Sequence, residues 1–374
     1  KFLKGGIWKN FLVKYEESNR IHKRSLELSK AREGVDDTAF DSALYKAQTN
    51  DALWHGVFGG LYLPNLRDNA YQYIIEAENV RYGKETLLVT DQNELDGYDK
   101  VKAVTAENIL RFDAAHGGQM IEFDNRQTCF NWQNTLTRRK EAYHKRLMTK
   151  ETPEELPPAE DGIDTIHHAD IEVDDALLDA IIYDWHLKNS FIDHISDRAF
   201  NEDNFRYANF KEYGDFCNQP FEVDCKKKKV TFSRNGGVYL PEKFDTTLKK
   251  SYMPKKSGMN FEIAISTKAK ESFNYVLEHN FHFAEYDAVT VNKQPLKESG
   301  MLENVSSLEI YDGELDKKIV ITLDKTSDVY YFQLNTLSQS EHGIDLTVQG
   351  VSFAIAIPFT SELSLKGSLE VESV

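Results

Sequence analysis

The hydrophobic pattern of this 374-residue chain changes its period near residue 85. Before that point apolar residues recur every three to four positions, the spacing that places side chains on one face of an α-helix. After it, apolar and polar residues alternate, and turn signals separate short strand candidates. The strands do not alternate with helices, which favours an antiparallel sandwich over a parallel sheet. We therefore predict an α+β fold: a short helical segment over residues 1–81 and a large antiparallel β-sandwich over residues 82–374.

Three helices are predicted before residue 82. Ser18 is a candidate cap for a helix that continues to about Glu33, and Asp36 or Asp37 for a second helix. Pro64 fits the first turn of a third helix. Three short helices bury too little apolar surface to be stable alone. We therefore expect them to lie against a larger body.

The remainder of the chain is predicted to be mainly β-structure. The dipeptide Asp-Asn at 124–125 can turn the chain between two strands, and Asn-Gly-Gly at 235–237 predicts a second hairpin turn. Residues 149–164 contain three prolines and several acidic residues. We expect this stretch to be a solvated loop inserted within the sandwich, because strand signals resume beyond it.

Charge and cysteine content exclude several classes of protein. The chain has 45 basic and 61 acidic residues, a formal net charge of −16, so neither nucleic acid nor an anionic membrane is an expected partner. No stretch approaches the roughly 18 uninterrupted apolar residues of a membrane span. Cys129, Cys217 and Cys225 lack paired CxxC spacing, which argues against a disulfide framework or a structural zinc site. We expect a reducing, cytoplasmic compartment and no metal or other cofactor.

One segment, residues 48–60, carries the residue types of a carbohydrate site. Asp51, Trp54 and His55 stand at i, i+3 and i+4, so a helix here would present them on one face. A carboxylate and an imidazole can transfer protons, and a flat indole can stack on the apolar face of a sugar ring. The spacing also fits a purely structural interpretation, with Trp54 as a core anchor, His55 as its hydrogen-bonded neighbour and Asp51 as a helix cap.

The sequence lacks the common short catalytic motifs. It contains no GxGxxG or GxxxxGK phosphate loop, no HExxH metal helix and no GxSxG nucleophile turn. This excludes little, because the two catalytic carboxylates of a glycosidase lie far apart in sequence and meet only in the fold. His167 and His168 have metal-ligating side chains, but they border the acidic loop and lack a second pair of ligands. We interpret them as part of a solvated loop.

Five separated segments are more distinctive than any single motif. They are GGIWKNFLVKYEESNRIHKR (5–24), KAQTNDALWHGVFGGLYLPNLR (46–67), HGGQMIEFDNRQTCFNWQNTLTRRKEAYH (116–144), YDWHLKNSFIDHI (183–195) and NTLSQSEHGIDLTVQG (335–350). In this order they resemble glycoside hydrolase family 57, in its branch of 4-α-glucanotransferases and α-amylases. The resemblance spans nearly the whole chain.

The resemblance implies how the chain is divided. In that family an incomplete seven-stranded (β/α) barrel carries a glutamate nucleophile and an aspartate acid/base. A helical segment then closes the cleft, and a supersandwich of the galactose-mutarotase type follows. Residues 1–81 would match the helical segment and residues 82–374 the sandwich, with the barrel and both catalytic carboxylates before Lys1. We therefore expect no catalytic residue in this chain, and no turnover of glucan by the chain alone.

The resemblance also gives the 48–60 segment a role. The last conserved motif of the family matches residues 50–55 and reaches the cleft beside the barrel. It implies that Asp51, Trp54 and His55 bind substrate: Asp51 as an acceptor for sugar hydroxyls or a partner of the missing acid, Trp54 as a stacking platform. Leu53 departs from the family pattern, because relatives often carry an aromatic residue there.

The expected function is that of the C-terminal portion of a retaining, α-glucan-active enzyme, which closes the cleft and braces the barrel. The substrate implied is an α-1,4-glucan or maltooligosaccharide, cleaved by double displacement. Two alternatives stay open. One is a stand-alone carbohydrate-binding or scaffolding protein without catalysis. The other is an α-mannosidase-like sandwich glycosidase, which would need a zinc site upstream of Lys1.

Overall fold

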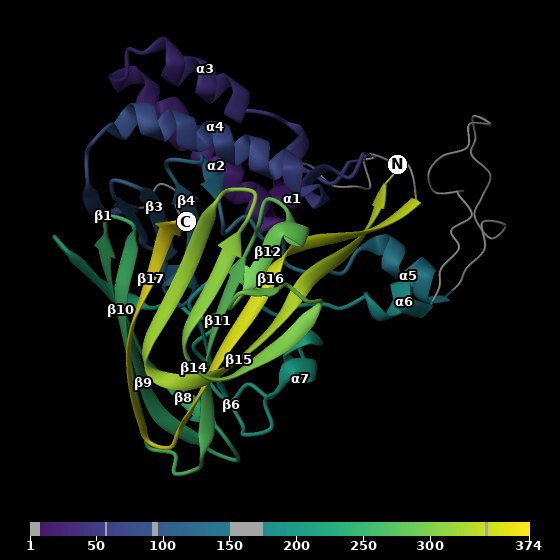
Figure 1. Cartoon of the computed structure of the whole chain (residues 1–374), viewed down its shortest axis with the longest axis vertical. Coiled ribbons are helices and arrows are strands. Elements are labelled where there is room, and N and C mark those ends of the chain that lie inside the picture. Colours follow the sequence, from purple (N-terminus) through teal and green to yellow (C-terminus); the bar gives the residue numbers. More distant parts are fainter. Residues whose placement is uncertain (1–7, 57, 92–95, 150–174, 341–342) are drawn as a thin grey trace.

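The computed structural model places a layer of helices on one side of two β-sheets (Figure 1). It describes residues 8–56, 58–91, 96–149, 175–340 and 343–374. The predicted loop at 149–164 therefore lies outside the described residues, apart from Thr149. The helices are α1 (Trp8–Lys14), α2 (Glu16–Ala31), α3 (Thr38–Ala47), α4 (Pro64–Tyr82), α5 (Ala142–Thr149), α6 (Asp175–Asp179) and α7 (Glu202–Arg206).

Two of the predicted helix starts are confirmed. The carboxylate of Asp37 caps α3 by accepting hydrogen bonds from the backbone N–H groups of Ala39 (2.7 Å) and Phe40 (3.3 Å). Pro64 is the first residue of α4, where its missing N–H costs no hydrogen bond. Local sequence chemistry therefore fixes the beginnings of both helices.

The predicted cap at Ser18 is wrong. Helix α2 begins at Glu16, after Tyr15, which makes no side-chain cap. The carboxylates of Glu16 and Glu17 lie in the first turn, where negative charge is favourable at the positive end of the helix dipole. The Ser18 hydroxyl lies inside the helix and donates instead to the carbonyl oxygen of Ala52 (3.2 Å).

All the strand pairs in both sheets are antiparallel, which confirms the predicted α+β fold with its antiparallel sandwich. The small sheet is the meander β1 (Leu87–Asp91), β2 (Lys100–Val104), β3 (Asn108–Asp113), β4 (Gln119–Asn125) and β5 (Phe130–Asn131). The strands of the large sheet are β6 (Ile192–Ser196), β7 (Glu222–Lys226), β8 (Lys229–Tyr239), β9 (Lys243–Lys255), β10 (Gly258–Thr267), β11 (Phe273–Phe281), β12 (Val289–Val291), β13 (Gln294–Pro295), β14 (Ser299–Asp312), β15 (Lys317–Ser340), β16 (Gly343–Phe359) and β17 (Glu362–Ser373). The predicted hairpin joins β4 to β5, but its turn is formed by residues 126–129, because Asp124 and Asn125 end β4 and pair with Asn131 and Phe130.

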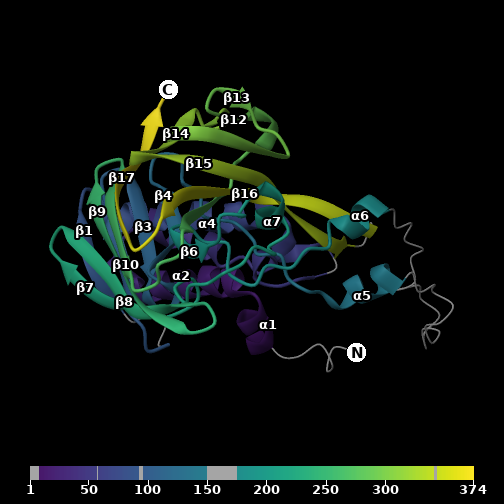
Figure 2. The ribbon, with the colours of Figure 1, turned by 90° about the horizontal axis from the view of Figure 1, so that it is seen from below.

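The large sheet divides into two branches at its longest strand, β15. One edge of β15 pairs with β14. The other edge pairs with β17 over residues 317–323 and with β16 over residues 328–340. The β17 branch continues through β10, β9, β8 and β7, and the β16 branch continues through β11 and β6. Side chains from both branches and from the small sheet form the main apolar core. Beyond that core, β15 and β16 extend toward α5 and α6 (Figure 2).

The hairpin turn predicted at 235–237 is wrong, because these residues lie within β8 and pair with β9. A Cβ atom at Gly236 would lie 2.1 Å from a carboxylate oxygen of Asp215. The N–H of Gly237 donates to that same carboxylate at 2.8 Å. The glycines therefore allow another segment to approach the strand closely and do not form a turn.

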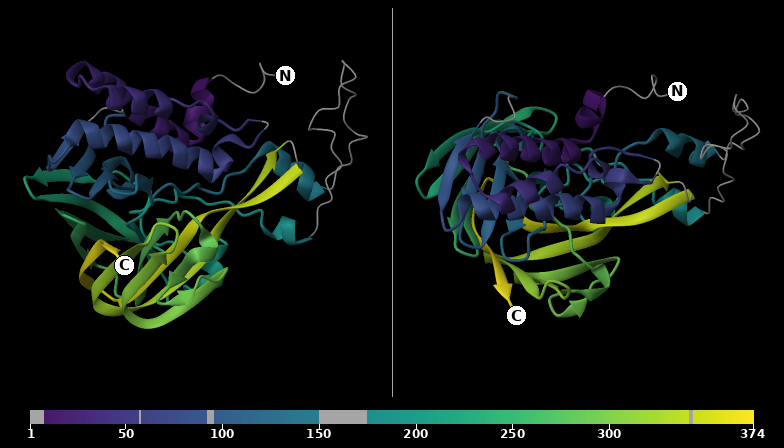
Figure 3. Two further views of the ribbon diagram at one scale, coloured as in Figure 1. Left: turned by 45° about the horizontal axis from the view of Figure 1, so that its top comes forward. Right: turned by 90° about the horizontal axis from the view of Figure 1, so that it is seen from above.

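The helical layer covers the small sheet (Figure 3). Helices α2, α3 and α4 share an apolar cluster that includes Ile21, Phe40 and Ile74. Helices α2 and α4 also contact the sheet, as expected: the Arg20 guanidinium of α2 donates to the carbonyl oxygen of Ile121 at 2.8 Å, and Glu78 of α4 pairs with Arg111 at 3.1 Å. Helix α4 ends at Tyr82, and the division of the chain into domains at residue 81 stays a prediction. Among the residues described, no helix is both long and apolar enough to cross a membrane.

Candidate functional site

Asp51, Trp54 and His55 lie on an open loop and not on the face of a helix. Residues Asp51–Leu53 form one 3₁₀ turn, and the backbone of Trp54 is extended, with φ −153° and ψ 169°. The helical spacing of these residues predicted that they share one face of a helix. That prediction is wrong, because the segment is not an α-helix. Asp51 and Trp54 are nevertheless exposed, and His55 is half-buried.

Two glycines hold this loop in shape. Gly59 and Gly60 have φ values of +98° and +57°, a region that favours glycine. A Cβ atom at Gly60 would lie 2.0 Å from the carbonyl oxygen of Trp54. That oxygen accepts a hydrogen bond from the N–H of Leu61 at 3.0 Å. The close return of the chain after Trp54 is what prevents a continuous helix here.

The indole of Trp54 belongs to an exposed group of aromatic rings. Its side chain is 40% exposed, so it is not the core anchor of the structural interpretation. Its ring meets Trp8 and Phe11 of α1 edge to face, with centroid distances of 6.0 and 6.1 Å. Trp8 is itself 37% exposed and contacts His22 of α2. The loop and α1 together present an aromatic surface to solvent.

His55 is held by two tyrosine rings and by the backbone of β15. Its ring lies 4.6 Å from the ring of Tyr62 and 5.7 Å from that of Tyr143. Its Nε2 lies 3.3 Å from the carbonyl oxygen of Gln339, which makes Nε2–H the donor. Burial lowers the pKa of His55, so the imidazole is neutral near pH 7. Nδ1 is then an acceptor.

Asp51 differs from its two neighbours in having no fixed partner. Within the described parts of the chain, its carboxylate makes no hydrogen bond and no ion pair. No hydrogen bond or ring contact in that part joins the three predicted site residues to one another. The three side chains therefore offer a hydrogen-bond acceptor, an aromatic platform and an imidazole as separate contacts.

Glu141 is the residue at this site that the sequence did not reveal. Its Oε1 accepts hydrogen bonds from the phenols of Tyr15 and Tyr62, both at 2.9 Å. Its Oε2 accepts from the ammonium of Lys14 at 2.5 Å. Burial first, and then the charge of Glu141, raises the pKa of both tyrosines, so they remain neutral donors. Glu141 thus ties α1, the 3₁₀ turn at 60–62 and the start of α5 together beneath His55.

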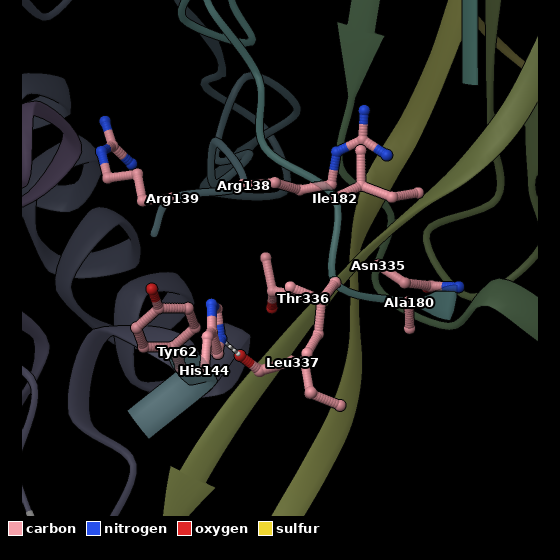
Figure 4. A pocket seen from close by; sticks show the side chains of 10 residues that line it. Tyr62, Arg138, Arg139, His144, Ala180, Ile182, Asn335, Thr336 and Leu337 are labelled. Atoms are coloured by element: carbon pink, nitrogen blue, oxygen red, sulfur yellow. Dashed lines mark hydrogen bonds between the residues drawn. The ribbon is translucent and has the colours of Figure 1, made fainter. Parts of the chain in front are cut away.

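A pocket opens beside Glu141 and the side chains bonded to it (Figure 4). It is small, with a cavity volume of about 10 Å³, and its walls come from the helical layer, the α5–α6 region and β15. His144 lines it, with Nε2 bonded to the carbonyl oxygen of Leu337 at 3.0 Å. The other lining residues are Tyr62, Arg138, Arg139, Ala180, Ile181, Ile182, Asn335, Thr336 and Leu337.

The arrangement suits binding better than proton transfer. The two arginines that line the pocket already form ion pairs. Arg138 pairs with Asp184 at 2.6 Å, and Arg139 pairs with Glu17 at 2.7 Å. Glu141 holds three donors on its two oxygens. A general acid must exchange a proton with substrate, whereas these groups are held in fixed pairs. The groups that remain free to contact a ligand are the carboxylate of Asp51, the exposed part of the Trp54 indole and Nδ1 of His55.

Two groups of side chains among the described residues bring metal-ligating atoms within 4.8 Å of one another. One is Glu16, Asp113 and His116, where Asp113 already accepts hydrogen bonds from Lys100 (2.6 Å) and from the N–H of Ala115 (2.8 Å). The other is the buried set His186, His194 and Cys217. Neither group includes a residue of the Trp54 loop.

The fold and the site place the chain in the class of antiparallel β-sandwich proteins that carry an added helical layer with an aromatic loop. Family comparison narrows this class. Residues 6–81 match the family model described as "Alpha-amylase/4-alpha-glucanotransferase, middle domain", and residues 92–369 match "Alpha-amylase/4-alpha-glucanotransferase, C-terminal". The chain therefore belongs to the alpha-amylase/4-alpha-glucanotransferase family, glycoside hydrolase family 57, which confirms the resemblance seen in its sequence.

Individual relatives agree. The chain is 34% identical over 367 residues to the 4-alpha-glucanotransferase of Thermococcus litoralis, covering 97% of this chain and 52% of that protein. It is 30% identical to Alpha-amylase 1 of Dictyoglomus thermophilum, covering 93% and 51%. The crystal structure of the Thermococcus litoralis 4-alpha-glucanotransferase superposes with a TM-score of 0.81 at 30% identity, covering 98% of this chain and 51% of that one. The chain thus spans about half the length of these relatives.

Proposed function

We propose that this chain forms one wall of the substrate cleft in an α-glucan-acting enzyme, a 4-α-glucanotransferase or an α-amylase, and braces the catalytic barrel that supplies the chemistry. The exposed indoles of Trp54 and Trp8, which pack against the half-buried ring of Phe11, carry the proposal, because an accessible indole is what a sugar ring stacks on. The family membership and the half-length match to the relatives support it.

Each predicted site residue then has a separate role toward an α-1,4-glucan or maltooligosaccharide. Trp54 stacks on a glucose ring, and the unpaired carboxylate of Asp51 accepts hydrogen bonds from sugar hydroxyls or faces the acid of the barrel. His55 offers Nδ1 as an acceptor, because Nε2–H is used by the carbonyl oxygen of Gln339. Glu141 is a positioning residue: it holds Tyr62, and the ring of Tyr62 holds His55.

In the complete enzyme the barrel would carry out double displacement with retention, through a glycosyl-enzyme intermediate. The contribution of this chain would be to orient the sugar and to limit the access of water to that intermediate. We also place the protein in the cytoplasm, since Cys129, Cys217 and Cys225 are free thiols.

The test uses a fusion of this chain to the N-terminal half of the Thermococcus litoralis 4-alpha-glucanotransferase. Trp54→Ala should lower kcat/KM for maltooligosaccharide by about 1–3 kcal/mol, or about 5- to 150-fold, because one sugar–aromatic contact and its positioning are lost. Tyr45→Ala is the matched control, since Tyr45 is a 59% exposed aromatic of the same helical layer, on α3. Equal kinetics for Trp54→Ala and the parent fusion would remove Trp54 from the cleft.

A second assay separates this proposal from its alternatives. The chain alone, incubated with maltotriose, should release no glucose and form no longer oligosaccharides. Clean transglycosylation by the chain alone would show that its catalytic carboxylates lie within these residues. Tight binding of maltooligosaccharide by the chain, with no activity in any fusion, would favour the stand-alone carbohydrate-binding protein.

A further inference from the structure

One exposed tryptophan lies outside the proposed cleft and is supported by buried rings. Trp185 is in the segment between α6 and β6 and is 41% exposed. Its ring contacts three others, with centroid distances of 4.5 Å to His186, 5.6 Å to His194 and 5.8 Å to Phe210. In the part of the chain that the structure describes, no ring contact or hydrogen bond joins Trp185 to the Trp54 loop. The proposed cleft therefore does not explain this indole.

The two imidazoles that support the indole are held in place by buried hydrogen bonds. His186 and His194 share one oxygen of Glu278, with their Nε2 atoms 2.9 and 3.0 Å from Oε2. Lys188 donates to the other oxygen, Oε1, at 2.9 Å. Nδ1 of His194 lies 2.7 Å from a carboxylate oxygen of Glu212. An aromatic surface that is fixed in this way before a ligand arrives loses little conformational entropy on binding.

Three exposed amide side chains come from the segments that pack on Trp185. Nδ2 of Asn218 donates to the carbonyl oxygen of Trp185 at 3.3 Å, and Gln219 is the next residue. Asn209 directly precedes Phe210, whose ring contacts the indole. Among the residues described, the side-chain amides of Asn209 and Gln219 have no hydrogen-bond partner. Each amide offers both a donor and an acceptor, the two functions that a sugar hydroxyl can pair with.

The charged residues next to this group in sequence have partners of their own. Asp184, which precedes Trp185, pairs with Arg138 at 2.6 Å. Lys211 lies 3.3 Å from a carboxylate oxygen of Asp197. The groups that stay available around the indole are therefore neutral amides. An accessible indole with a few neutral hydrogen-bonding groups suits an uncharged, hydroxylated ligand better than an ionic one.

We propose that Trp185 is the centre of a second binding site for α-glucan, on the sandwich and outside the Trp54 loop. The amides that complete it are those of Asn209, Asn218 and Gln219. The choice of α-glucan rests on the proposed function. Its glucose rings have apolar faces and hydroxyl edges, so one ring can stack on the indole while the amides bind its hydroxyls. A second contact on the same polymer raises the effective concentration of glucan at the cleft.

The test measures the binding of maltoheptaose to the whole chain by isothermal titration calorimetry. Trp185→Leu keeps an apolar side chain against the neighbouring rings but removes the aromatic surface. Affinity should therefore fall about 5- to 30-fold, the usual loss when the central tryptophan of a binding site is removed. Tyr239→Ala is the matched control, since Tyr239 is a 47% exposed aromatic at the end of β8, and it should bind like the wild type.

Three results of this titration would overturn the proposal. They are no binding by the wild-type chain, equal affinity in the wild type and Trp185→Leu, and an equal loss in Tyr239→Ala. Trp54→Ala separates the two sites, because it should leave the affinity of the chain for maltoheptaose nearly unchanged. Binding that is lost in Trp54→Ala and kept in Trp185→Leu would overturn this inference and support the proposed cleft. Unchanged kinetics of the Trp54→Ala fusion would instead remove Trp54 from the cleft and leave this site standing.

Tryptophan emission gives a second readout, which does not require Trp185→Leu to fold. The chain has four tryptophans, and Trp132 is fully buried. With Trp8 and Trp54 both replaced by phenylalanine, Trp185 is the one exposed indole that remains. Maltoheptaose should then shift the emission to shorter wavelength, because a stacked sugar displaces water from the indole. Unchanged emission at saturating maltoheptaose would overturn the proposal.

Discussion

The two faces of the small sheet bury opposite kinds of side chain. Toward the sandwich, its strands contribute Val101, Ala103, Leu110, Phe112 and Phe123 to the main apolar core. Toward the helices, the alternate positions carry Lys102, Arg111 and Glu122, which are at most 7% exposed. Both faces are therefore closed to water, one by packing alone and the other by pairing of charges. Alternation along a strand reports which layer a residue faces, not whether it is solvated.

The charged face works because helices α2 and α4 supply the complementary groups. Arg24 contacts Glu78 at 2.6 Å and Glu122 at 3.1 Å. Arg111 contacts Glu27 at 2.8 Å and Glu78 at 3.1 Å. Burial would favour neutral carboxyls, but the guanidiniums of Arg111 and Arg24 lower the pKa of Glu27 despite it. Such a face offers little net stability over an apolar one, but it penalises any shift of the helices that would separate the pairs.

The largest predicted effect is on this charged face. Arg24→Met keeps an unbranched apolar stem but removes the guanidinium, so that Glu78 and Glu122 stay buried with Arg111 as their remaining common partner. The free energy of unfolding should fall by about 3–5 kcal/mol, the usual cost of removing one member of a buried ionic network. Urea unfolding followed by circular dichroism measures it.

Arg32→Met is the matched control for that variant. Arg32 pairs with Asp41 at 2.5 Å, but the two side chains are 49% and 30% exposed. Solvent screening limits such a pair to about 1 kcal/mol or less. Equal losses in the two variants would mean that burial does not distinguish the helix–sheet contact from an ordinary surface pair.

A smaller effect, with a defined pH dependence, is predicted at Glu17 of α2. Burial alone would raise the pKa of Glu17, but the charge of Arg139 and hydrogen bonds from Arg139 and Thr137 lower it from 4.5 to about 2. A lowered pKa stabilises the fold above pH 4.5, and this stabilisation is lost as the pH falls toward 2. Glu17→Gln should therefore cost roughly 3 kcal/mol at pH 7.

The pH series separates this charge effect from a loss of packing. The difference between wild type and Glu17→Gln in urea unfolding should be constant from pH 7 to about 5 and should shrink steadily between pH 4.5 and 2. A difference of the same size at every pH would show that the amide is simply a poorer fit, and that the ion pair with Arg139 adds nothing.

Much of the fold could be predicted from the sequence where the signal is local. The change of period, the cap at Asp37 and the position of Pro64 depend on neighbouring residues only. What failed depends on distant partners. The turn predicted at 235–237 failed because Gly236 pairs with Thr246 of β9, and its missing Cβ leaves room for the carboxylate of the distant Asp215.

The candidate site likewise has features that the sequence predicts and features that depend on distant residues. Residue types and family resemblance identified Trp54 and His55, and both lie on the exposed loop. Their arrangement was not predictable from spacing, because the positive φ angles at Gly59 and Gly60 turn the chain back before a helix can form. Glu141 was missed because its partners come from distant segments and no short motif contains it.

The smallest predicted effect is on the apolar face, at Phe112, the neighbour of Arg111 on β3. Phe112 is fully buried and stacks on Tyr252, with ring centroids 4.6 Å apart. Phe112→Leu keeps the position apolar and loses a little volume and the ring contact, so it should cost about 1–2 kcal/mol. Arg111→Leu, one residue away, removes a guanidinium from the buried ionic network and leaves Glu27 to Lys102 and Glu78 to Arg24, so it should cost at least twice as much.

The pair of variants is informative because the two side chains leave one strand in opposite directions and differ in the layer they meet. Apolar packing is non-directional and can relax around a smaller side chain, whereas a buried carboxylate cannot find a new donor without moving a helix. If Phe112→Leu proved as costly as Arg111→Leu in urea unfolding, the apolar face would be as intolerant of change as the charged one. The contrast between the two faces would then be one of composition only, with no consequence for how firmly each layer is held.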